Sequence, residues 1–196
     1  MSSRLCILNL TNNGANPEKP KSINLPAEVA YQGTSITSAD DIPTDPNLIL
    51  YVIAHAVPGG LIDPSGKVLD ESELAKTIRA KRKALSTLII WDACFAKSLL
   101  SIVGADVWPT NFVHIFSSQA FERAWHSDTV TLLSIELGKA IETLAKDGAF
   151  EWDALQKQLQ ERLSPIQHPE ILPRTGLRAA DFQLDLLRGA AAGASA

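Results

Sequence analysis

A histidine and a cysteine, two residue types that together perform covalent chemistry, follow apolar segments of this chain. His55 comes directly after the apolar run 48–54, and Cys94 lies three residues after the apolar run 87–91. An imidazole can orient or deprotonate a neighbouring thiol, and the thiolate attacks an acyl carbon without a metal ion. The pair therefore predicts a nucleophilic site with Cys94 as the attacking group and His55 as its acid–base partner.

The spacing of the pair favours this interpretation. His55 and Cys94 are 39 residues apart, which is the length of one strand–helix–strand crossover between adjacent parallel strands. Taken singly, a cysteine is more often a small buried residue, and a histidine at a strand end is more often a hydrogen-bonded loop residue. Cys6 lies inside an apolar run, and we expect it to be buried and inert.

The elements that would position this pair can be read from the apolar pattern. Expected strands cover 5–10, 48–54, 87–91 and 111–116, with a short one around 28–31, and expected helices cover 70–85, 129–145 and 152–163. Strands that alternate with helices predict an α/β domain, and the continuous apolar runs predict a mostly parallel sheet covered on both faces. Residues 181–186 fit either an edge strand or a last helix.

Further polar residues stand where strands of this sheet end. Asp92 precedes Cys94 by two residues, and Ser117 and Ser118 follow the run 111–116. Trp125 lies in the loop after that run. Because open α/β sheets bind ligands beyond the carboxyl ends of their strands, we expect these four residues to line the substrate site, with Trp125 as a wall of the cleft.

The order of these motifs resembles the caspase-like cysteine peptidases, which include caspases, metacaspases, legumain, gingipains, separase and bacterial caspase-like domains. In that family a strand ends in His-Gly and a later strand ends in Asp-x-Cys or Ala-Cys. The corresponding segments here are 50–56 and 88–95, and 116–122, 128–131, 167–169 and 181–184 are similar to later motifs. The resemblance covers residues 47–186 and implies a three-layer caspase-like sandwich, a mostly parallel central sheet with helices on both faces.

The same resemblance implies an endopeptidase mechanism. Cys94 would attack the scissile carbonyl, His55 would protonate the leaving amine, and the N–H groups of Cys94 and Ala56 would hold the oxyanion. Ala56 stands where the family has glycine, and its methyl group restricts the backbone. Two alternatives therefore stay open: a catalytically inactive caspase-like module that binds a peptide or regulates a partner protein, and a different Cys–His acyl-transfer enzyme.

Specificity in this resemblance depends on Asp92. In metacaspases, which share the Asp-x-Cys arrangement, an aspartate so placed recognises arginine or lysine before the scissile bond, by charge pairing with a bidentate option for arginine. The resemblance thus predicts cleavage after basic residues. Lys97 and Arg123 could instead neutralise Asp92, and Asp92 could simply cap the next helix or orient the loop.

The composition of the chain limits its domain organisation and its partners. The 196 residues are 45% hydrophobic and 20% charged, which predicts a single globular domain over 1–188 and a flexible Gly/Ala/Ser tail over 189–196. A formal net charge of −4 disfavours nucleic acid as a partner, and no run is long enough to cross a membrane. Two cysteines suit a reducing, cytoplasmic setting. We expect no metal and no cofactor, and as partners a protein or peptide substrate or a regulatory protein.

The basic run 81–83 has two interpretations. It is most simply the solvated end of a helix, where cations suit the helix dipole. The alternative is an exposed cleavage or docking site for another protein.

Overall fold

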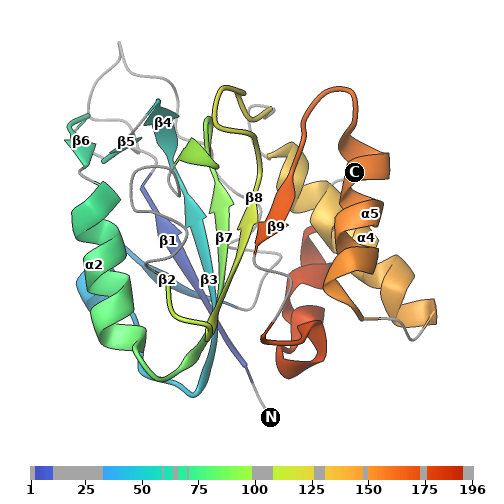
Figure 1. Cartoon of the computed structure of the whole chain (residues 1–196), viewed down its shortest axis with the longest axis horizontal. Coiled ribbons are helices and arrows are strands. Elements are labelled where there is room, and N and C mark those ends of the chain that lie inside the picture. Colours follow the sequence, from blue (N-terminus) through green and yellow to red (C-terminus); the bar gives the residue numbers. More distant parts are fainter. Residues whose placement is uncertain are drawn as a thin grey trace.

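The computed structural model describes residues 3–10, 33–58, 60–63, 66–69, 71–98, 108–125, 131–147, 150–172 and 176–191. Its centre is a six-stranded sheet in the order β2-β1-β3-β7-β8-β9 (Figure 1). The strands are β1 (Arg4–Asn9), β2 (Thr34–Ile36), β3 (Asn47–Ile53), β7 (Ser86–Asp92), β8 (Phe112–Phe116) and β9 (Glu170–Leu172). The first five run parallel, and β9 is antiparallel to β8.

The central strands are buried on both faces, as their continuous apolar runs predict. Every residue of β3 and β8 is buried, and only the first residue of β7 is partly exposed. Alternate side chains enter two separate cores, so that Leu88 and Ile90 pack on one face and Ile89 and Trp91 on the other.

Helices cover each face of this sheet. Helix α2 (Glu71–Arg82) lies on one side, where Leu74 and Ile78 join the core, and α4 (Leu132–Asp147) and α5 (Trp152–Leu163) lie on the other (Figure 1). The described residues also form three 3₁₀ helices: η1 (Ala39–Asp41), η3 (Ala179–Asp181) and η4 (Leu184–Ala191). None of the described helices has the length and apolar character that crossing a bilayer requires.

A second, small sheet stands beyond the carboxyl ends of the main strands. It consists of β4 (His55–Val57), β5 (Gly60–Ile62) and β6 (Val68–Leu69), all antiparallel (Figure 1). None of the expected strands covers this segment, because strands of two or three residues between glycines and prolines leave little periodic signal. The small sheet matters because His55 and Ala56 belong to it.

The outcome for the remaining segments is mixed. Within 181–186, Asp181 ends η3 and Leu184 begins η4, so the edge-strand alternative is wrong and the helical one is right for 184–186. Phe182, Leu184 and Leu187 are buried against the core beside α4. The edge strand is β9 instead. The expected strand around 28–31 lies outside the described residues. Helix η4 continues to Ala191, three residues into the expected tail, and 192–196 lie outside the described residues.

Arg82, the middle cation of the basic run, fits neither of the two interpretations, because it is not solvated. Its side chain is fully buried, with Nε donating to Thr87 Oγ1 at 3.0 Å and Nη1 donating to the carbonyls of Pro43 at 3.0 Å and Asp45 at 2.5 Å. Nη2 donates to the Ser86 carbonyl at 2.9 Å. Burial lowers the pKa of Arg82 to about 10. The middle cation of the run thus fastens the end of α2 to the amino ends of β3 and β7, and no protease could reach it there.

Candidate active site

The register of the sheet brings the two predicted catalytic residues to one edge. Strands β3 and β7 are parallel neighbours, and their last paired residues are Ile53 and Asp92. His55 and Cys94 each lie two residues beyond that pair, at equal distances along adjacent chains. Ala54 N donates to the Asp92 carbonyl at 3.3 Å, which holds the two chains together one residue further. The predicted adjacency of these two strands is confirmed.

The chain changes sheets at His55. Strand β4 pairs with β5 so that His55 lies opposite Ile62 and Ala56 opposite Leu61. His55 and Ala56 are both half-buried. The small sheet therefore fixes the backbone of His55 and Ala56, and with it the positions of the imidazole and of the Ala56 N–H.

Cys94 lies on a tight turn directly after β7. It is half-buried, and its Sγ lies 3.9 Å from the carbonyl oxygen of Ala124. The next residue, Phe95, has a φ of 56°, a left-handed conformation that non-glycine residues seldom adopt. Its N–H donates to the Glu122 carbonyl at 2.7 Å, and its carbonyl accepts from Ser98 N at 2.8 Å. These bonds hold a strained backbone beside the thiol, a feature that clusters at functional sites.

Ser117 and Ser118 brace that turn from β8. The Ser117 hydroxyl accepts from Ala93 N at 3.1 Å and donates to the Ala93 carbonyl at 2.8 Å. The Ser118 hydroxyl accepts from Ala96 N at 3.0 Å and donates to the same carbonyl at 3.0 Å. Both side chains are fully buried. This geometry corrects the expected role: the serines position the backbone on each side of Cys94 and do not face a substrate.

Asp92 points to the opposite side of the sheet from α2, where α4 begins. Its side chain is 2% exposed, and its Oδ2 accepts hydrogen bonds from the Tyr51 hydroxyl at 2.5 Å and from the Thr131 hydroxyl. Thr131 Oγ1 also accepts from Ser134 N at 3.2 Å, at the start of α4. Asp92 thus ties β7 to β3 and to the first turn of α4. Two hydroxyl donors stabilise its carboxylate and orient it beside the turn that carries Cys94.

Sequence reasoning missed Tyr51 and Thr131. The available signal for Tyr51 was a hydroxyl-bearing side chain in an otherwise aliphatic buried strand, since a buried tyrosine usually bonds its O–H to a partner. Register then places Tyr51 opposite Ile90, two residues from Asp92 on the same face of β7. Thr131 carried no such signal, because only the fold brings the start of α4 to the end of β7.

Lys97, a candidate counter-ion for Asp92 in the sequence, is engaged elsewhere. Its Nζ pairs with Glu170 Oε2 at 2.5 Å and donates to Gln119 Oε1 at 3.2 Å. Lys97 therefore joins the segment after Cys94 to the edge strand β9.

An exposed apolar surface adjoins the thiol. Trp125 is 60% exposed and Phe121 is 94% exposed, and both belong to the loop whose Ala124 carbonyl lies near Cys94 Sγ. The buried side chain of Gln167 supports this loop: its Oε1 accepts from Trp125 N at 2.9 Å and its Nε2 donates to the Ser117 carbonyl at 2.6 Å. The role of Trp125 as a wall of the substrate cleft stays a prediction.

A second polar link braces the same loop. His168 Nδ1 lies 2.7 Å from Glu122 Oε1, and Glu122 Oε2 accepts from the backbone N–H groups of Gln119 and His168. Partial burial alone would raise the pKa of Glu122, but these hydrogen bonds, with the one from His168 the strongest, hold it below its usual range. Among the described residues, no cluster of three His, Cys, Asp or Glu side chains is arranged to bind a metal ion.

Comparisons with known proteins inform the fold and not the chemistry. No protein-family model matches the sequence, and no curated protein is similar to it. The chain is similar in structure to protein GSU0716 from Geobacter sulfurreducens, with a TM-score of 0.57 over 88% of this chain and 93% of that one. The two sequences are 11% identical, so the likeness concerns the fold alone. The chain is an α/β protein with a mostly parallel six-stranded central sheet.

Proposed function

We propose that this protein is a cysteine endopeptidase of the caspase-like type, with Cys94 as nucleophile and His55 as its acid–base partner. The observation that carries the proposal is the register of β3 and β7. From the paired residues Ile53 and Asp92, both chains run two residues further to the imidazole and the thiol. A histidine and a cysteine so placed at the carboxyl edge of a parallel sheet stand where such sheets bind their ligands.

The proposed reaction has two steps. The Cys94 thiolate attacks the scissile carbonyl carbon; a C–S bond forms, the C–N bond breaks, and His55 gives its proton to the departing amine. Water then attacks the thioester, which releases the new carboxylic acid and returns the thiol. The N–H groups of Cys94 and Ala56 would stabilise the oxyanion in both steps. Ser117 and Ser118 support this scheme because they fix the backbone that carries the Cys94 N–H.

We further propose that the enzyme cleaves after arginine or lysine. Asp92 places a carboxylate two residues before the nucleophile, and the hydroxyls of Tyr51 and Thr131 hold it in one orientation. Asp92 is only 2% exposed, so its carboxylate is poorly solvated and would favour a cationic side chain that reaches it from the turn at Cys94, where arginine or lysine could form a charge-assisted hydrogen bond. Trp125 would cover another part of the substrate with its exposed ring.

Fluorogenic peptides that differ only in the residue before the scissile bond test the proposal. The wild-type protein should hydrolyse the arginine and lysine members, and Cys94→Ala should lose this activity while Cys6→Ala keeps it. Unchanged hydrolysis by Cys94→Ala would end the catalytic assignment. If the wild type hydrolyses no member of a broad library yet binds peptides, the inactive module is the better description.

A further inference from the structure

A pocket separate from the proposed active site lies at the carboxyl end of β1, on the face of the sheet that α2 covers. Its volume is about 550 Å³, within the range of about 300–1,000 Å³ that holds small molecules. The sheet order turns at β1, since β2 lies on one side of it and β3 on the other. Ligands of open α/β sheets bind at such turning points.

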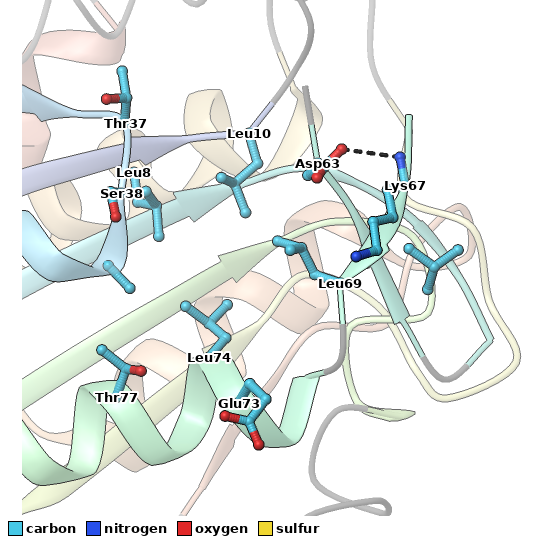
Figure 2. Close-up of a pocket in the computed structure, with 12 residues that line it drawn as sticks. Leu8, Leu10, Thr37, Ser38, Asp63, Lys67, Leu69, Glu73, Leu74 and Thr77 are labelled. Atoms are coloured by element: carbon cyan, nitrogen blue, oxygen red, sulfur yellow. Dashed lines mark hydrogen bonds between the residues drawn. The ribbon is translucent and has the colours of Figure 1, made fainter. Parts of the chain in front are cut away.

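Four elements wall this pocket (Figure 2). The end of β1 gives its floor, the residues after β2 and the first turns of α2 give two sides, and the β5–β6 hairpin gives another. The lining is aliphatic on the floor, with Leu8 and Leu10, and on the adjoining side, with Leu74 of α2; all three are otherwise buried in the core. Apolar groups of a ligand would be removed from water there, which favours binding roughly in proportion to the area covered.

Charges of both signs stand around this floor. Lys67 and Asp63 belong to the hairpin, and Glu73 belongs to α2. Asp63 Oδ1 accepts from the backbone N–H of Lys67 at 2.9 Å, so this hydrogen bond does not involve the Lys67 ammonium (Figure 2). Glu73 contacts Lys76 at 2.7 Å in an exposed pair one helical turn apart, a type of pair that contributes little and yields readily to a competing cation.

Hydroxyl groups complete the lining. Thr37 follows β2, and Thr77 stands on the second turn of α2. A hydroxyl both donates and accepts, so these two groups suit a peptide bond, which presents one donor and one acceptor.

We propose that this pocket binds a short aliphatic peptide with free termini, for which leucyl-leucine is the simplest probe. The leucine side chains would cover the aliphatic floor, the terminal carboxylate would face Lys67, and the terminal ammonium would face Glu73 and Asp63. This site is independent of His55 and Cys94, and the proposal does not rest on peptidase activity.

Titration of the full chain by NMR tests the proposal with two probes. Leucyl-leucine should shift the amide signals of Leu10, Lys67 and Thr77. N-acetyl-leucyl-leucinamide, which has the same side chains and no charge, should bind about fivefold more weakly or worse, because each exposed ion pair contributes up to about this factor. Equal binding of the two probes would overturn the assignment of the charges, and no binding of leucyl-leucine up to its solubility limit would overturn the site.

Matched variants locate the site. Lys67→Met should weaken leucyl-leucine about fivefold and leave the neutral probe unchanged, whereas Lys83→Met, an exposed lysine just beyond α2, should change neither. Thr77→Trp should fill the pocket and abolish binding, and Ala80→Trp, at an exposed position of the same helix, should not. Thermal unfolding confirms that each variant is folded. Binding that survives Thr77→Trp in a folded chain would place the peptide elsewhere and refute the proposal, and Cys94→Ala should bind like the wild type.

Discussion

The polar residues around Cys94 act by fixing the position of neighbouring backbone groups and side chains through hydrogen bonds. The hydroxyls of Ser117 and Ser118 are buried and bonded to the chain on each side of Cys94, and neither polar residue was expected to be so deep. The sequence placed them correctly at the end of a strand. It could not tell which way they point, because a strand end can face either solvent or the neighbouring chain.

Replacing Ser117 separates positioning from substrate contact. Ser117→Ala leaves the Ala93 N–H without a partner and its carbonyl with the Ser118 hydroxyl alone, so it should destabilise the protein by about 1–3 kcal/mol and shift the turn at Cys94. We expect kcat to fall between about tenfold and a hundredfold, since misplacement by about 1 Å can cost that much, with little change in KM. Steady-state kinetics gives both values. A rise in KM at unchanged kcat would instead indicate contact with the substrate.

Asp92 makes a prediction about specificity. Asp92→Asn keeps the size of the side chain and one oxygen for the Tyr51 and Thr131 hydroxyls, but removes the negative charge. For substrates with arginine before the scissile bond, kcat/KM should fall about tenfold to a hundredfold, the contribution of one charged hydrogen bond. Substrates with glutamine there, which have no charge, should change far less. If Asp92→Asn changes kcat/KM by the same factor for the arginine and the glutamine substrates, Asp92 only ties β7 to α4.

At the scale of elements, the long buried strands were predictable and the short ones were not. The run at 48–54 is apolar without interruption, those at 87–91 and 111–116 are mostly apolar, and the structure forms β3, β7 and β8 there. Strands β2 and β9 have three residues each and take their place from pairing with β1 and β8. Their pattern is too short to read locally, because the free energy of pairing comes from a partner distant in the sequence.

The small sheet that carries His55 makes an element-scale prediction. A Cβ on Gly60 would lie 2.3 Å from Val68 Cγ1, so in Gly60→Ala either the Val68 side chain or the strands β5 and β6 must shift. Because β4 pairs with β5, we expect peptidase activity to fall about tenfold or more, with the midpoint of thermal unfolding much less affected.

A second substitution checks this mechanism. Val68→Ala removes the clashing Cγ1 at a position that is 50% exposed, so alone it should change stability by less than about 0.5 kcal/mol. The double variant Gly60→Ala/Val68→Ala should recover most of the activity. If Gly60→Ala alone is fully active, the small sheet does not position the imidazole.

For the molecule as a whole, a buried histidine in an aromatic cluster links stability to pH. Trp91 Nε1 donates to His114 Nδ1 at 3.1 Å, and the ring centroids of Trp108 and Phe116 lie 4.6 and 5.7 Å away. Burial lowers the pKa of His114 from 6.5 to about 3. Between these two values the unfolded chain binds a proton that the folded chain excludes, so stability falls as the pH drops.

The dependence of the free energy of unfolding on pH can be measured. Below pH 6.5 His114 should lower the free energy of unfolding by about 1.4 kcal/mol per pH unit, until the pH nears 3. His114→Phe should be less stable at pH 7, because the Trp91 N–H loses its acceptor, but its stability should vary less between pH 6.5 and 4. Urea unfolding at several pH values gives the slope. Equal slopes for the wild type and His114→Phe would show that His114 is not the group that the folded chain keeps unprotonated.

The central claim, that Cys94 and His55 form one reactive unit, is tested most directly by the rate at which each cysteine is alkylated. Cys6 is 1% exposed, and burial raises the pKa of its thiol, so it provides a slow reference within the same molecule. With iodoacetamide and mass-spectrometric mapping, Cys94 should be labelled at least tenfold faster than Cys6, and His55→Ala should slow Cys94 and leave Cys6 unchanged. Faster labelling of Cys6, or a Cys94 rate indifferent to His55 in the folded protein, would contradict the account.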